Sequence, residues 1–149
     1  MKYLSITLGL FFLGFFSVNA QSESKRKLSK LELKQLVSYS DSIQLELKKI
    51  YKIEKKENTP AKYQPQRIQL VKDYLWLFQY IESQFNIVVF TEHDIIKIIG
   101  KPNKHAIENG EHKFFYTEIN RPYLRLKNFN YTLSFKSKQL VSMKYLNEW

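Results

Sequence analysis

The chain has 149 residues, of which 44% are hydrophobic and 15% aromatic, and its formal net charge is +10. This length and this apolar share suit one globular domain and exclude an intrinsically disordered chain. The absence of cysteine excludes disulfides, thiol nucleophiles and lipid anchors attached through a thiol.

The first 20 residues have the pattern of a secretory signal peptide. Lys2 precedes an apolar run over residues 4–16, and the small residue Ala20 ends a cleavage site. Because the run is shorter than the roughly 20 apolar residues of a membrane span, we expect cleavage after Ala20 and export to the periplasm or beyond. Cleavage removes one of the 24 basic residues and leaves a net charge of +9.

The next part of the chain predicts a helical hairpin over residues 29–86. Residues 21–28 are polar and basic and are predicted to be disordered. Apolar residues then recur at the three- to four-residue spacing of a helix until about residue 57, and residues 58–65 have the composition of a turn. The apolar positions of the first helix are Leu36, Tyr39, Ile43, Leu47 and Ile50.

The second helix is apolar around most of its circumference, so one neighbour cannot cover it. We expect it to lie between the first helix and a C-terminal sheet. Trp76 and Tyr80 are then either core residues or an exposed aromatic strip that binds a partner. The lysines that end the first helix are either a solvated face or a docking patch for an acidic surface. They are Lys48, Lys49, Lys52, Lys55 and Lys56.

A short helix follows, and local chemistry defines both of its ends. Thr91 is a suitable N-cap, and Asp94 completes a capping box three residues later. Gly100 suits the left-handed conformation just past the helix, and Pro102 prevents continuation. A helix of about two turns is unstable alone, so its isoleucines are predicted to dock on the strands that follow.

Residues 104–145 change to the period of two that strands have. Asn109-Gly110 is a strong hairpin signal, and residues 131–136 and 139–145 alternate as two antiparallel neighbours. The predicted fold class is therefore α+β: a helical hairpin, a short capped helix, and an antiparallel meander of three or four strands. Residues 87–149 are expected to form one compact domain with residues 29–86.

These C-terminal features resemble the BamE (SmpA/OmlA) outer-membrane-assembly lipoproteins, and the repeats of β-lactamase-inhibitor proteins share the same plan of helix and sheet. The resemblance covers residues 87–149 and implies an envelope or secreted scaffold that works through protein contacts. Because this chain has no cysteine, the lipid anchor of those proteins does not carry over. The matching positions are Thr91, Asp94, Ile95, Ile99, Gly100, Pro102, Tyr116, Leu133, Phe135 and Val141.

The sequence offers little catalytic chemistry. After residue 20 only Gly100 and Gly110 remain, which excludes a glycine-rich phosphate loop or a nucleophile elbow. His105 and His112 flank the predicted hairpin turn, beside Glu108 and Glu111, and are either exposed hairpin residues or a weak metal site. We assign no catalytic, cofactor-binding or metal-ligating residue and predict that the protein is not an enzyme; a hydrolase built on these histidines ranks last.

The predicted function is that of an exported protein-binding or scaffold module of the bacterial cell envelope. The expected partner is an envelope protein or an acidic surface, including anionic lipid or glycan, rather than nucleic acid, because an exported chain rarely meets nucleic acid. The alternative is a carrier of a small ligand or lipid, with a pocket between the second helix and the sheet. A basic and aromatic cluster around Tyr123 and Arg125 is either a site for an anionic ligand or a protected strand edge. The candidate partner-binding residues are Trp76, Tyr80, Tyr123, Arg125, Tyr131 and Phe135.

Overall fold

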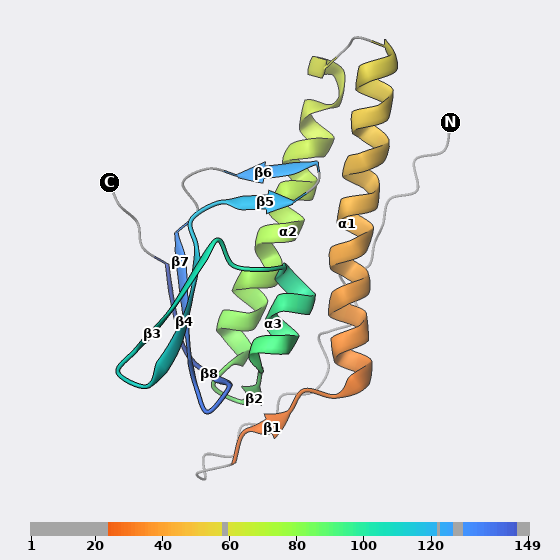
Figure 1. The fold of residues 1–149 in the computed structure, drawn as a ribbon. Coiled ribbons are helices and arrows are strands. Elements are labelled where there is room, and N and C mark those ends of the chain that lie inside the picture. Colours follow the sequence, from red (N-terminus) through yellow and green to blue (C-terminus); the bar gives the residue numbers. More distant parts are fainter. Residues whose placement is uncertain (1–23, 58–59, 122, 127–129, 146–149) are drawn as a thin grey trace.

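The computed structural model describes residues 24–57, 60–121, 123–126 and 130–145, apart from the side chains of residues 60–61, 119–121 and 124–126. It is an α+β fold in which the helices lie on one side of an antiparallel sheet (Figure 1). The helices are α1 (Lys30–Glu57), α2 (Gln64–Gln84) and α3 (Glu92–Ile99), with a 3-10 helix, η1 (Pro60–Tyr63), before α2. The strands are β1 (Arg26–Lys27), β2 (Val88–Val89), β3 (Lys104–Glu108), β4 (Glu111–Tyr116), β5 (Ile119–Arg121), β6 (Leu124–Leu126), β7 (Tyr131–Lys136) and β8 (Gln139–Tyr145).

α1 begins with a reciprocal pair of hydrogen bonds between Ser29 and Glu32. The Glu32 backbone N–H donates to the Ser29 hydroxyl (3.1 Å), and the Ser29 N–H donates to the Glu32 carboxylate (2.9 Å). The pair satisfies two amides at the start of the helix. Arg26 donates to both oxygens of the same carboxylate, at 2.9 and 2.6 Å.

The segment before α1 is ordered where it pairs with β2. β1 lies parallel to β2, with Arg26 opposite Val88, and the Arg26 N–H donates to the Ile87 carbonyl (3.0 Å). The prediction of disorder over residues 21–28 is therefore wrong for β1, because a backbone pairing and the contact to Glu32 hold this segment in place. Residues 21–23 lie outside the described part of the chain.

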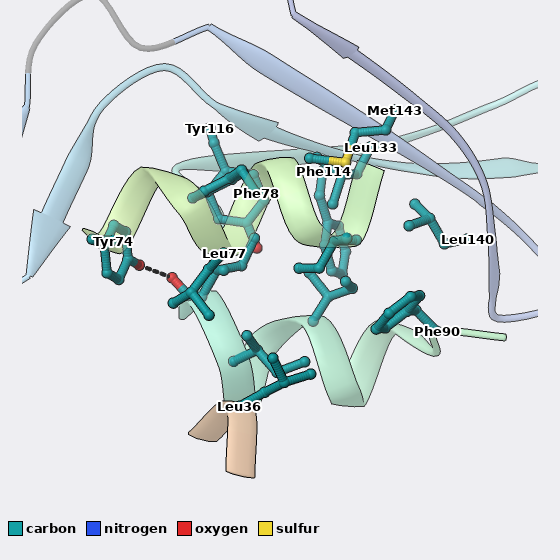
Figure 2. Close-up of a cluster of buried hydrophobic side chains, with 14 of the residues drawn as sticks. Leu36, Tyr74, Leu77, Phe78, Phe90, Phe114, Tyr116, Leu133, Leu140 and Met143 are labelled. Carbon is teal, nitrogen blue, oxygen red and sulfur yellow. Dashed lines mark hydrogen bonds between the residues drawn. The ribbon is translucent and has the colours of Figure 1, made fainter. Parts of the chain in front are cut away.

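The predicted helical hairpin is confirmed, and α2 lies between α1 and the sheet (Figure 1). Phe78 of α2 contacts the sheet, with its ring centroid 5.6 Å from that of Tyr116 and 5.1 Å from that of Tyr131. Figure 2 shows Phe78 beside Tyr116 within the cluster of buried side chains. Burying one such aromatic side chain contributes about 1.5–3 kcal/mol, so this contact between α2 and the sheet is a main source of stability.

The main sheet has four strands in the order β3-β4-β7-β8, and all neighbours are antiparallel. This agrees with the predicted meander, except that β5 and β6 form a separate two-stranded hairpin between β4 and β7. Asn109 and Gly110 form the turn between β3 and β4 with φ of 53° and 78°, as the hairpin signal predicts. The register shifts between Ser134 and Phe135, which leaves Val141 of β8 as the extra residue of a β-bulge.

The predicted capping box of α3 is present. The Asp94 N–H donates to the Thr91 hydroxyl (3.2 Å), and the Thr91 N–H donates to the Asp94 carboxylate (2.9 Å). The start of α3 also joins the sheet, because the Glu92 N–H donates to the Lys138 carbonyl (3.3 Å). α3 is thus fixed to the β7–β8 turn as well as to the core.

Candidate functional site

The outer side of the helical hairpin carries three aromatic rings in contact, Tyr39, Trp76 and Tyr80, here called the aromatic strip. The Trp76 ring centroid lies 5.6 Å from that of Tyr39 on α1, edge to face, and 5.2 Å from that of Tyr80 on α2. Trp76 is 39% exposed, whereas Tyr39 and Tyr80 are half-buried. The strip therefore offers one exposed indole held between two partly covered rings.

The position of Trp76 follows from the helical period. Tyr74 and Phe78 are both fully buried on the core side of α2, and each is two residues from Trp76. Two residues on an α-helix turn the side chain by about 200°, so Trp76 points away from that core side. The sequence left this residue between core and surface, and the structure places it at the surface of the seam between α1 and α2.

The strip is electrically neutral and lies near an ion pair. Burial raises the pKa of Tyr80, and the nearby Glu32 carboxylate raises it further, while Arg26 lowers it. Burial also raises the pKa of Tyr39, with a smaller contribution from Asp73. Both phenols therefore keep their protons at neutral pH.

The other candidate residues are spread over the fold. Tyr123 is 41% exposed, and its ring centroid lies 5.4 Å from that of Tyr51 on α1, which joins the β5–β6 end to the helical hairpin. Arg125 is a residue of β6, and its side chain lies outside the described part of the chain. The basic part of the predicted cluster thus lies outside the described side chains, and the cluster stays a prediction.

Tyr131 and Phe135 lie on the face of β7 that packs against the helices. Phe135 is only 1% exposed, so its assignment as a partner contact is wrong, because the face of β7 that carries it is the one covered by the core. Tyr131 is half-buried between Phe78 (5.1 Å between centroids) and Tyr145 (4.8 Å), and burial raises its pKa. These rings occupy the space between α2 and the sheet where the alternative function needs a pocket.

The lysine-rich end of α1 is exposed but interleaved with acid. Lys49 pairs with Glu46 (2.6 Å) on the same helix. The carboxylate of Glu54 is held by Arg67 of α2 at 3.1 Å. The exposed Lys49–Glu46 pair contributes about 0–1 kcal/mol, whereas Glu54 is a buried carboxylate. The lysines of this end are themselves exposed, so it fits the interpretation of a solvated face.

The two hairpin histidines do meet, and a carboxylate that was not predicted, that of Glu92, lies beside His112. His112 Nε2 lies 3.3 Å from His105 Nδ1, and His112 Nδ1 lies 3.1 Å from a carboxylate oxygen of Glu92. Of the two predicted neighbours, Glu108 and Glu111, the first pairs with Lys113 (2.6 Å). Within the described residues, no three His, Cys, Asp or Glu side chains are arranged to hold a metal ion.

Sequence reasoning missed two residues of these arrangements. Tyr39 was assigned only to the buried face of α1, and its contact with Trp76 depends on the angle between two helices. Glu92 is 20 residues from His112, and no motif spans that separation. A long-range contact of either kind leaves no periodic signal in the sequence.

No protein-family model, curated protein or solved structure matches this chain. The resemblance to the BamE lipoproteins stays a prediction, and it concerns positions that build the fold. The function of this chain is therefore inferred from its surface and its side-chain geometry.

None of the helices in the described part of the chain has a stretch long and apolar enough to cross a membrane.

Proposed function

We propose that this protein is an exported, non-enzymatic module of the cell envelope that binds another protein through the aromatic strip. The observation that carries the proposal is the exposed indole of Trp76, held between Tyr39 and Tyr80 on two packed helices. Tryptophan and tyrosine are enriched among the few interface residues that supply most of the binding energy. A folded monomer gains little from leaving such a side chain partly in water.

The rigidity of the strip supports a role in binding. Both helices of the hairpin are packed together, and Tyr39 meets Trp76 edge to face, so the rings are already ordered before a partner arrives. Binding then loses less side-chain freedom than it would on a mobile loop. The hydroxyl group of Tyr39 gives such a contact a polar partner at its rim.

Export is part of the proposal and depends on the signal-peptide pattern of residues 1–20. In an envelope compartment a mature chain of charge +9 attracts acidic proteins, anionic lipids and acidic glycans. The charge then accelerates encounter, while the aromatic strip provides the specific contact. The basic surface and the aromatic strip have separate tasks in this proposal.

The alternative function, a carrier of a small ligand or lipid, has less support. Phe78, Tyr116 and Tyr131 fill the layer between α2 and the sheet with rings in contact. A ligand in this layer would have to displace them and lose their packing. An apolar carrier normally has its cavity formed in advance.

Site-specific crosslinking in cells tests the proposal. A photo-crosslinking residue replaces exposed Gln79 beside the strip, and a matched control places it at exposed Val141 on β8. We expect one envelope protein to crosslink from position 79 and not from position 141. Trp76→Ala should weaken its binding by about 30-fold or more, the effect of losing about 2 kcal/mol.

Two results would contradict the proposal. One is equal crosslinking from positions 79 and 141, which indicates nonspecific contact. The other is undiminished binding by a Trp76→Ala variant whose melting temperature shows that it is folded. If a lipid or glycan is recovered with the purified protein and no protein is crosslinked, the result favours the carrier function.

A further inference from the structure

One cluster of side chains has no part in the proposed function: Glu92 at the start of α3, with His105 and His112 on the β3–β4 hairpin. In the register of this hairpin, His105 is opposite Phe114 and His112 is opposite Ile107. Directly opposed residues point to the same face, so the two histidines are diagonal neighbours on one face. The Asn109-Gly110 turn fixes this register and therefore the spacing of the two rings.

The contact with Glu92 determines which nitrogen of His112 is free. A carboxylate can only accept a hydrogen bond, so we assign the His112 proton to Nδ1, which donates to Glu92 at 3.1 Å. The lone pair of Nε2 then faces Nδ1 of His105. Glu92 is itself held, because its backbone N–H donates to the Lys138 carbonyl. A carboxylate behind a histidine is the usual arrangement that orients a metal-ligating imidazole.

We propose that His105 Nδ1 and His112 Nε2 together bind a divalent transition-metal ion such as Zn²⁺, with Glu92 as the positioning residue. The two nitrogens are 3.3 Å apart. Two imidazole nitrogens bound to a tetrahedral zinc ion at about 2.0–2.1 Å each lie about 3.3 Å apart. The distance between the two nitrogens therefore already suits one ion.

The surroundings leave the remaining coordination positions open to water. His105 and the adjacent Ile107 are exposed, and Ile107 is 77% exposed. Since the described part of the chain arranges no group of three His, Cys, Asp or Glu ligands, two solvent molecules complete a tetrahedral site. Imidazole ligands favour zinc, copper and nickel over magnesium or calcium. Without a metal, the same two nitrogens can share one N–H···N hydrogen bond.

Calorimetric titration of the chain with Zn²⁺, without a histidine tag and at neutral pH, tests the proposal. We expect one zinc ion per chain and no heat of binding with Mg²⁺. His105→Gln should abolish zinc binding, whereas His93→Gln, a change at an exposed histidine of α3, should leave it unchanged. Co²⁺ should give the visible absorption of a bound ion in the wild type and not in His105→Gln.

Variants of Glu92 separate positioning from ligation. Glu92→Ala should weaken zinc binding by about 10- to 100-fold, the usual effect of removing the partner of a ligating histidine. Glu92→Gln should retain most of the affinity, because its amide oxygen still accepts from Nδ1. His112→Gln provides a second removal of a ligand, and circular dichroism confirms that each variant is folded.

The proposal fails if the wild type gives no heat of zinc binding, or if the folded His105→Gln variant binds zinc as tightly as the wild type. It also fails if His93→Gln and His105→Gln lose affinity equally, because the ion is then bound by histidines in general. None of these outcomes depends on a protein partner, so the metal site and the proposed binding function are tested separately.

Discussion

The hydroxyl of Tyr74 on α2 donates a hydrogen bond to the carbonyl of Ile99 in the last turn of α3 (Figure 2). Carbonyls at the end of a helix have no partner within it, and both Tyr74 and Ile99 are buried. The Tyr116 hydroxyl of β4 donates in the same way to the next carbonyl, that of Gly100 (2.8 Å). Two tyrosines from different elements thus complete the end of α3.

Tyr74→Phe should destabilise the fold by about 1–3 kcal/mol. The ring keeps its packing, but the buried Ile99 carbonyl loses its donor and remains without water. Chemical denaturation of the two proteins measures the difference. Tyr51→Phe is the control, because Tyr51 is 51% exposed, and it should change stability by less than about 0.5 kcal/mol. Equal losses in both variants would contradict this role of Tyr74.

Gly100→Ala should destabilise the fold by about 1–3 kcal/mol, for a reason of backbone conformation. Gly100 has φ of 91° and ψ of 179°, a region that essentially only glycine occupies. A side chain here must either be strained or displace the carbonyl that Tyr116 binds. The measurement is the free energy of unfolding in urea. Gly110→Ala, also at positive φ but with open space around the position, is the comparison that separates strain from crowding.

The parts of the fold that the sequence predicted correctly are those with local signals. The capping box joins Thr91 to Asp94, the hairpin turn is Asn109-Gly110, and the helical hairpin follows from apolar spacing. Each depends on residues within a few positions of one another. Local propensity and the tertiary fold agree at these points, and the prediction succeeded for that reason.

The candidate site was harder to predict, because strand alternation defines two faces without saying which one is covered. Phe135 was placed at a surface and lies in the core, whereas Trp76 could be assigned to either and lies at the surface. Glu92 meets His112 only because α3 is docked beside the β3–β4 hairpin. These outcomes are set by the packing of elements that are distant in the sequence.

The β7–β8 turn offers a way to stabilise the protein. Ser137 and Lys138 have φ of 50° and 64°, which are unfavourable for residues with a side chain. Such two-residue turns prefer Asn-Gly. Ser137→Asn combined with Lys138→Gly should therefore raise the free energy of unfolding by about 1 kcal/mol or more, because both new residues tolerate positive φ better. The hydrogen bond from the Glu92 N–H to the carbonyl of residue 138 involves only backbone atoms and is retained.

Thermal and urea unfolding check this prediction. The matched control is the reverse change at the other hairpin, Asn109→Ser with Gly110→Lys, which should destabilise the fold by a similar amount. If the double substitution at residues 137–138 lowers the melting temperature while the fold is kept, the positive φ values of that turn do not limit stability.

The ion pair between Arg26 and Glu32 predicts a specific loss of stability in acid. The hydrogen bonds from Arg26, supported by Ser29, lower the pKa of Glu32 from 4.5 to about 2 in the folded chain. A depressed carboxyl pKa means that the unfolded chain takes up the proton first as the pH falls. The contribution of Glu32 is therefore complete above about pH 4.5 and is lost as the pH falls toward 2. Because the Arg26 side chain is 52% exposed, screening limits this contribution to about 1 kcal/mol.

Unfolding free energies of the wild type and Glu32→Gln, measured between pH 6 and pH 2.5, test this assignment. The wild type should be more stable at pH 6, and the two curves should converge as the pH falls. Arg26→Gln should also flatten the dependence, because it removes the main cause of the shift. Parallel curves for wild type and Glu32→Gln over this range would mean that the pair between β1 and α1 does not contribute to acid sensitivity.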